Sequence, residues 1–191
     1  MSGDGRTALL IMDMQRGVVS RLDAAAPLPA RLAEAARAAR AAGALVVYVG
    51  VGYLPGHPEI GPASAFTQLK EAGAFTLGAP EAELHDDLTA EPGDVQVTKK
   101  RFSAFSGSEL ELVLRSNGVT HLVLTGMVTS GVVLSTLREA SDKDYALTVL
   151  SDGCVDYDDE VQRVLMDKVF PRQAGVRTIA DWTASLSPAR G

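Results

Sequence analysis

Two side chains of opposite charge follow strand-like segments of the sequence. Asp13 comes directly after the continuous apolar run Thr7–Met12. Lys99 follows Asp94–Thr98, which alternates between apolar and polar residues. A carboxylate at the end of a buried strand is costly unless it is paired, and a lysine beside it would hold it ionised until substrate binding makes it a proton donor or acceptor. The two residues therefore indicate acid–base chemistry, with a turn-capping aspartate and an ordinary structural salt bridge as the simpler alternatives.

A third strand end carries a glycine-containing join. Leu122–Thr125 is a short apolar run closed by Gly126, and helical spacing resumes at Ser130. The join Gly126–Gly131 therefore leads from a strand into a helix, where unpaired backbone N–H groups favour negative charge. Ligands of open α/β sheets bind at the carboxyl ends of strands, so this join is a candidate site, although an ordinary βα turn has the same local pattern.

Strand-like and helix-like segments alternate along the chain. The strand-like segments are Thr7–Met12, Ala44–Gly50, Asp94–Thr98, Val119–Thr125, Tyr145–Leu150 and the weaker Gly175–Thr178. The helix-like segments are Leu28–Ala42, a segment to about Asn117 opened by a capping box at Ser106–Glu109, Ser130–Ser141, a segment from Asp158 or Asp159 to about Phe170, and Asp181–Ser185. This order predicts an α/β fold of three layers, α/β/α, with a six-stranded, mostly parallel sheet between helices.

One long segment, residues 51–93, lacks clear strand periodicity. Tyr53–Glu59 is a loop by its proline and glycine content, and Phe66–Ala72 and Ala82–Leu88 are possible short helices. So long a segment inside a domain is often a lid or a binding loop. His57 is the one histidine placed to face a ligand, although a solvated or turn-stabilising histidine is the commoner case. We expect a single domain over residues 1–191 that includes this binding loop.

Composition narrows the class of protein. The 191 residues are 46% hydrophobic and 22% charged, with a net charge of −6, and the densest basic cluster is only Lys99–Arg101. These values fit a globular protein and argue against a nucleic-acid or anionic-membrane partner. The single cysteine excludes an internal disulfide and fits a reducing compartment. No signal pattern or membrane-length apolar run is present, so we expect a cytoplasmic protein.

Common cofactor and nucleophile motifs are absent from the sequence. Neither GxGxxG nor GxxxxGK[ST] occurs, the GxSxG elbow is missing, and His57, His85 and His121 are isolated. We therefore expect no cofactor and no metal. Cys154 follows the fifth strand-like segment without an evident base beside it, which favours a small packing residue near the site over a nucleophile.

Three segments together resemble the isochorismatase-like hydrolases, also called the cysteine hydrolase superfamily. They are ALLIMDMQ (8–15), KKRFSAFSGSELELVLR (99–115) and LVLTGMVTSGVVLSTLREA (122–140). The resemblance implies a six-stranded parallel sheet sandwiched by helices. In the amidase branches an aspartate, a lysine and a cysteine form the catalytic triad, and the first two match Asp13 and Lys99 rather than Lys100. The family also implies a cis peptide before Thr129, at Val128–Thr129, with backbone N–H groups forming an oxyanion hole.

The sequence departs from this family at the nucleophile, where Val132 takes the place of the cysteine. A valine cannot attack a carbonyl, so the thioester route is excluded at that position. The isochorismatases proper also lack the cysteine, and their aspartate acts as a general acid on a vinyl ether before water adds. The loop at 51–93 has no evident ring of cations for a dicarboxylate, so isochorismate itself is not predicted.

We therefore expect a hydrolase of a small molecule that works by Asp13 and Lys99 chemistry without a cysteine. Substrate-binding positions are expected at Gln15, Phe105, Val128, Thr129, Ser130 and Val132. The alternative is a catalytically inactive relative that binds a small molecule or assembles with other proteins. The resemblance also implies a homodimer or homotetramer.

Overall fold

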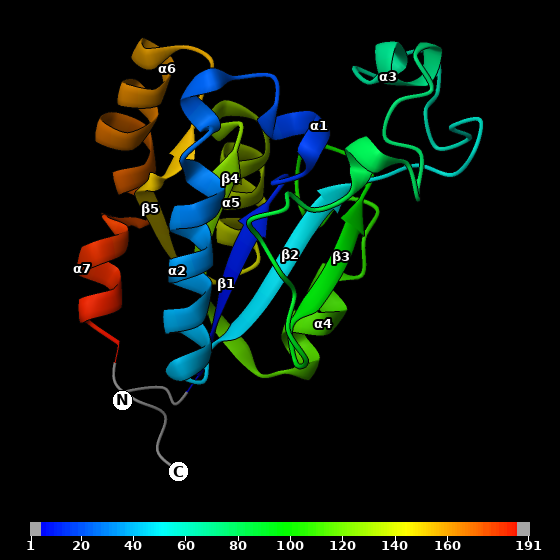
Figure 1. Ribbon diagram of the computed structural model, residues 1–191. Coiled ribbons are helices and arrows are strands. Elements are labelled where there is room, and N and C mark those ends of the chain that lie inside the picture. The colour runs from blue at the N-terminus through cyan, green and yellow to red at the C-terminus, as the bar shows by residue number, and fades with distance from the viewer. Residues whose placement is uncertain (1–4, 187–191) are drawn as a thin grey trace.

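Six strands form a parallel sheet in the order β3-β2-β1-β4-β5-β6. In the computed structural model, which describes residues 5–186, they are β1 (Arg6–Met12), β2 (Leu45–Val51), β3 (Val95–Lys99), β4 (Val119–Met127), β5 (Ala146–Val155) and β6 (Gly175–Arg177). Each neighbouring pair is parallel, so the carboxyl ends of the strands meet at one edge of the sheet (Figure 1). The predicted six-stranded sheet is confirmed.

Helices cover both faces of this sheet. They are α1 (Arg16–Val19), α2 (Leu28–Ala41), α3 (Thr67–Glu71), α4 (Leu110–Ser116), α5 (Leu134–Asp142), α6 (Asp159–Val164) and α7 (Ile179–Ala184). Helices α2 and α7 lie on the near face in Figure 1, and α4 and α5 lie behind the sheet. The structure therefore has the predicted three-layer α/β/α architecture.

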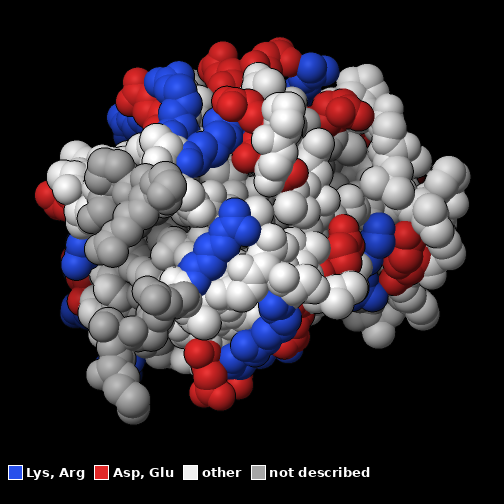
Figure 2. All heavy atoms as spheres, turned by 90° about the horizontal axis from the view of Figure 1, so that it is seen from below, with Lys and Arg blue, Asp and Glu red and all other residues white. Residues whose placement is uncertain are grey.

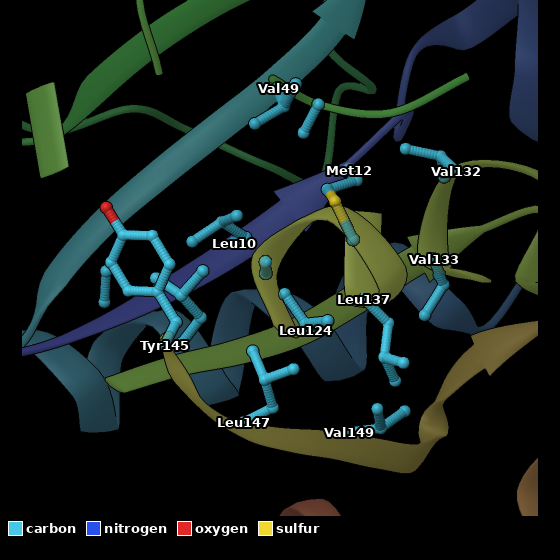
Figure 3. Close-up of a cluster of buried hydrophobic side chains, with 14 of the residues drawn as sticks. Leu10, Met12, Val49, Leu124, Val132, Val133, Leu137, Tyr145, Leu147 and Val149 are labelled. Atoms are coloured by element: carbon cyan, nitrogen blue, oxygen red, sulfur yellow. The ribbon is translucent and has the colours of Figure 1, made fainter. Parts of the chain in front are cut away.

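Side-chain alternation along β1 explains the two cores. Leu10 and Met12 point to the face of α4 and α5, in the cluster shown in part in Figure 3. Leu9 and Ile11 point to the opposite face and pack with α2 and α7. Because successive residues of a strand face opposite sides, a strand covered on both sides must be apolar throughout. This requirement explains the unbroken apolar run in the sequence.

The segment between β2 and β3 forms a subdomain-like loop with a small cluster of its own. Val51, Tyr53, Ile60 and Phe75 are buried together, and α3 stands to one side of the sheet (Figure 1). The far end of the loop is held to helix α2 by an ion pair, in which Nη2 of Arg40 lies 2.6 Å from Oδ2 of Asp94. The loop is therefore an ordered wall beside the strand ends.

Several element boundaries differ from the predictions. The predicted capping box at Ser106–Glu109 is wrong, because α4 begins at Leu110. The N–H of Leu110 donates to Oγ of Ser108. The helix predicted at Ala82–Leu88 is absent from the described structure. Of this segment, only Ala82 is helical, as the last residue of the 3₁₀ turn Pro80–Ala82. The predicted helix after β4 is confirmed with a modification, since its first turn, Thr129–Val133, is π-helical.

The surface at the amino-terminal edge of the sheet carries charges of both signs. Figure 2 views the molecule from this side, and there lysines and arginines are interspersed with aspartates and glutamates. None of the helices within residues 5–186 is long and apolar enough to cross a membrane. The cytoplasmic location and the homodimer or homotetramer stay predictions.

Candidate active site

Asp13 and Lys99 form an ion pair across the end of β2. Asp13 follows β1, Lys99 is the last residue of β3, and Nζ of Lys99 lies 2.9 Å from Oδ2 of Asp13. The lysine side chain is only 3% exposed, and its Nζ also donates to the backbone oxygen of Arg101 at 2.9 Å. Lys100 points elsewhere, toward Glu59. The structure thus brings together the predicted pair and selects Lys99 over Lys100.

The Asp13 carboxyl is held in a state suited to proton transfer. Burial raises the pKa of Asp13 above its ordinary value of 3.8, and the Lys99 charge offsets this rise only in part. Oδ1 is buried and has no hydrogen-bond partner within residues 5–186. The backbone of Asp13 has a φ of 54°, a left-handed conformation that aspartate tolerates better than most residues. One carboxyl oxygen is therefore paired with the lysine, and the side chain as a whole is 13% exposed and lines the cavity described next.

A cavity of about 350 Å³ opens beside this pair. Its polar side chains are those of Asp13, Lys99, Arg21 and Ser130. The rest of the wall is mostly apolar or aromatic and comprises Val18, Val51, Phe66, Leu69, Phe102, Met127, Val128, Gly131, Val132 and Tyr157. A largely apolar cavity with a few convergent polar groups is typical of a small-molecule site.

The turn after β4 supplies part of the cavity wall. Gly126 has a φ of 124°, and a Cβ there would lie 2.0 Å from the backbone oxygen of Met12, so only glycine fits. The cis peptide is Met127–Val128, and the prediction of Val128–Thr129 is wrong by one residue. The side-chain pattern does not distinguish two successive peptide bonds of one irregular turn, which explains the error.

The carboxylate of Asp156 accepts a hydrogen bond from one of the backbone N–H groups of this turn. The N–H of Ser130 donates to Oδ2 of Asp156 at 2.6 Å, and Oδ1 accepts from the N–H of Tyr157. Among the predicted turn residues, Val128, Ser130 and Val132 line the cavity. Because Asp156, just beyond the end of β5, already accepts from the Ser130 N–H, this N–H is not free to take part in the expected oxyanion hole.

Three predicted substrate-binding residues lie away from the cavity lining. Phe105 stacks on Tyr145, with 6.1 Å between ring centroids, in the core beneath α4. The residue that lines the cavity is Phe102, three positions earlier in the same irregular turn. Thr129 is fully buried behind the turn. Gln15, the third, is also buried, and its contacts give it a different role.

Gln15 fastens the loop between β2 and β3 to the sheet. Its Nε2 donates to the backbone oxygens of Val51 at 2.8 Å and Ala82 at 2.6 Å, and its Oε1 accepts from the N–H of Val51. The amide thus holds the end of β2 and the returning loop against the end of β1. Gln15 positions the walls of the site and does not line the cavity.

Replacing Gln15 by alanine should lower the free energy of unfolding by about 1–3 kcal/mol, because buried backbone groups lose their partners. Urea unfolding followed by circular dichroism would measure this loss. Gln68→Ala on α3 is the matched control and should change stability by less than about 0.5 kcal/mol. Equal stabilities of Gln15→Ala and the wild type would contradict the positioning role.

The remaining candidates have structural contacts. Nε2 of His57 lies 2.7 Å from the backbone oxygen of Ala74, and the buried ring stabilises the loop. The Cys154 thiol is buried 3.9 Å from the backbone oxygen of Leu124, and burial raises the pKa of Cys154 far above its ordinary range. Within residues 5–186 no three His, Cys, Asp or Glu side chains gather where they could hold a metal ion.

Comparison with known proteins identifies the family. The Isochorismatase domain family matches residues 7–181. This chain belongs to the isochorismatase family. The prediction of an isochorismatase-like hydrolase is thereby confirmed at the level of the family. The three sequence segments that carried the resemblance lie in β1, in the turn after β3 with α4, and in β4 with α5.

Relatives of this family member cover nearly its whole length. It is 30% identical over 206 residues to the ureidoacrylate amidohydrolase RutB of Enterobacter sp., covering 95% of this chain and 90% of that protein. RutB of Pseudomonas syringae pv. syringae is 32% identical over 208 residues, with 96% and 85% covered. An isochorismatase family protein from Burkholderia thailandensis superposes with a TM-score of 0.82 at 31% identity, covering 94% of this chain and 95% of the other.

Proposed function

We propose that this protein hydrolyses a small organic molecule by proton transfer at Asp13, without a thiol nucleophile. The observation that carries the proposal is the largely buried Asp13–Lys99 pair, both of whose side chains line a cavity of about 350 Å³. Burial raises the pKa of Asp13 and so favours the protonated form, which can donate a proton. Lys99 then stabilises the carboxylate that remains.

The proposed reaction balances with water alone. Protonated Asp13 donates its proton to the leaving part of the substrate as the bond to that part breaks. Water adds to the carbon that loses the leaving part, and a proton of this water returns to the Asp13 carboxylate. The Lys99 ammonium offsets the negative charge of Asp13 between the two transfers.

Val132 supports a route without a covalent intermediate. In the segment TSGVVLST, Val132 stands at the position that the cysteine has in the amidase branches that this chain resembles. It lines the cavity and has no atom that could attack a substrate. The only thiol of the chain, Cys154, does not line this cavity and is poorly suited to ionise. The relatives named ureidoacrylate amidohydrolase make carbamoyl and amide compounds the first class to test, followed by vinyl ethers.

A substrate panel tests the proposal. Purified wild-type protein and Asp13→Asn are incubated with ureidoacrylate, other N-carbamoyl compounds, simple amides and vinyl ethers, and the products are followed by mass spectrometry. Turnover by the wild type that Asp13→Asn lacks supports the proposal. Turnover that persists equally in Asp13→Asn contradicts it.

A second function is favoured by the same valine. A relative that lost its nucleophile could retain the cavity for binding or assembly, with the Asp13–Lys99 pair as a structural remnant. Thermal shifts of the wild type with compounds of the panel, in the absence of any turnover, would favour this alternative.

The proposed proton donation predicts a one-sided pH dependence. Since the pKa of Asp13 is raised above 3.8 in the folded protein, the donating form is complete below 3.8 and is lost as the pH rises through the raised pKa. The value of kcat/KM should therefore fall as the pH increases across that interval. A pH profile of kcat/KM in the wild type measures this, and a rate that rises over the same range would rule out Asp13 as the proton donor.

A further inference from the structure

Arg21 lies on the cavity wall with its guanidinium held on one side. It belongs to the segment that follows α1, and its Cζ lies 5.4 Å from the centroid of the buried Phe75 ring. This is a cation–π distance, and the N–H groups of the guanidinium donate no hydrogen bond to residues 5–186. The side chain is thus oriented by the binding loop without losing its hydrogen-bonding capacity.

The charge of Arg21 has no counterpart within residues 5–186. No carboxylate of this part of the chain forms an ion pair with it, and its side chain donates no hydrogen bond there. The other arginines near the site differ from it. Arg16 pairs with Asp86, and Arg101 donates to the backbone oxygens of Lys100 and Glu59. Arg21 therefore lines the cavity with guanidinium N–H groups that donate no hydrogen bond to any residue within 5–186.

The cavity consequently carries an excess positive charge inside an acidic protein. Asp13 and Lys99 compensate one another, which leaves the charge of Arg21, although the whole chain has a net charge of −6. When Asp13 is protonated, both Lys99 and Arg21 remain uncompensated. A carboxylate bound at the guanidinium edge by two parallel hydrogen bonds would match this charge.

The remaining walls fit a flat or apolar molecular body. Phe66 and Phe102 pack together with 4.7 Å between their ring centroids, and both line the cavity. Phe102 is 49% exposed and Tyr157 is 54% exposed, so aromatic rings stand open to solvent at the cavity. Exposed aromatic surface around a polar centre is typical of a binding site.

We infer that Arg21 binds the carboxylate of a small carboxylic acid whose flat or apolar body lies against Phe66 and Phe102. This inference deepens the proposed function, on which it rests only for the bond that Asp13 would cleave. Binding of the acid itself requires Arg21 and the aromatic walls, not catalysis.

Calorimetric titration with matched acids and amides tests this inference. The probes are phenylacetate, 3-phenylpropionate and cinnamate, each paired with its neutral amide, at pH 7. The proteins are the wild type, Arg21→Met, Arg21→Lys and the control Arg37→Met on the outer face of α2, with folding checked by thermal unfolding. Arg21→Met retains an apolar stem and removes the charge, the N–H donors and the cation–π contact with Phe75.

At least one acid should bind the wild type at least about tenfold more tightly than its amide, and Arg21→Met should lose that difference. Arg21→Lys should retain only part of it, and Arg37→Met should retain all of it. Equal affinities of acid and amide for the wild type, including no measurable binding of either, would overturn the inference, as would an unchanged preference in Arg21→Met. Because no turnover is needed, failure of the proposed Asp13 chemistry leaves this result unaffected.

Discussion

Replacing Asp13 by asparagine should lower kcat/KM for the substrate found in the panel by about 10²–10⁴-fold, which is the usual contribution of a positioned acid or base. Asparagine has nearly the same shape as aspartate, and its Oδ1 can still accept a hydrogen bond from Lys99. It cannot donate a proton to a leaving group and recover it from water. Initial rates at several substrate concentrations would measure the loss.

Two further variants separate the loss of the acid group from a loss of stability. Asp13→Asn leaves the Lys99 ammonium buried without its counter-charge, which destabilises a protein. The double variant Asp13→Asn with Lys99→Met removes both charges, and it should be folded by circular dichroism and equally inactive. Asp144→Asn is the matched control, because Asp144 also has a positive φ, 63°, but is exposed between α5 and β5. Full activity in Asp13→Asn would exclude Asp13 as the catalytic group.

Replacing Val132 by cysteine should place a reactive thiol in the cavity. Val132 lines the same cavity as Lys99, and a nearby ammonium lowers the pKa of a thiol. Iodoacetamide should therefore label Val132→Cys at least about tenfold faster than it labels the wild type, whose buried Cys154 is a poor nucleophile. We also expect Val132→Cys to hydrolyse amides of the panel that the wild type leaves intact.

The control for this thiol is Val132→Ala, which opens the same space without sulfur. Intact-protein mass spectrometry after timed labelling compares the three proteins, and tryptic peptides locate the label. Labelling of Val132→Cys no faster than of Val132→Ala would show that this position is closed to small reagents, and the place of the missing nucleophile would have to be sought elsewhere.

The sequence was sufficient for the parts of the site that regular elements position. Asp13 follows a strand whose unbroken apolar run required burial on both faces, and the family resemblance selected Lys99 rather than Lys100. Parallel strands then bring both residues to one edge of the sheet. The strand ends and the resemblance together therefore allowed the ion pair to be predicted without coordinates.

Irregular turns determined the rest and could not be read from periodicity. Phe102 and Phe105 stand three residues apart in one turn, and only its three-dimensional path puts the first in the cavity and the second in the core. Arg21 and Tyr157 reach the cavity from distant parts of the chain. Asp156 contacts Ser130 because β5 extends beyond its predicted end at Leu150. No local pattern in the sequence predicts any of these contacts.

Activity of a cysteine-free variant tests the central claim most directly. Cys154 is the only cysteine of the chain, so Cys154→Ala removes every thiol with a small change in side-chain volume. If hydrolysis depends on Asp13 and Lys99 alone, kcat/KM of Cys154→Ala should stay within about twofold of the wild type. Loss of hydrolysis in a folded Cys154→Ala protein would contradict the claim that this enzyme works without a thiol.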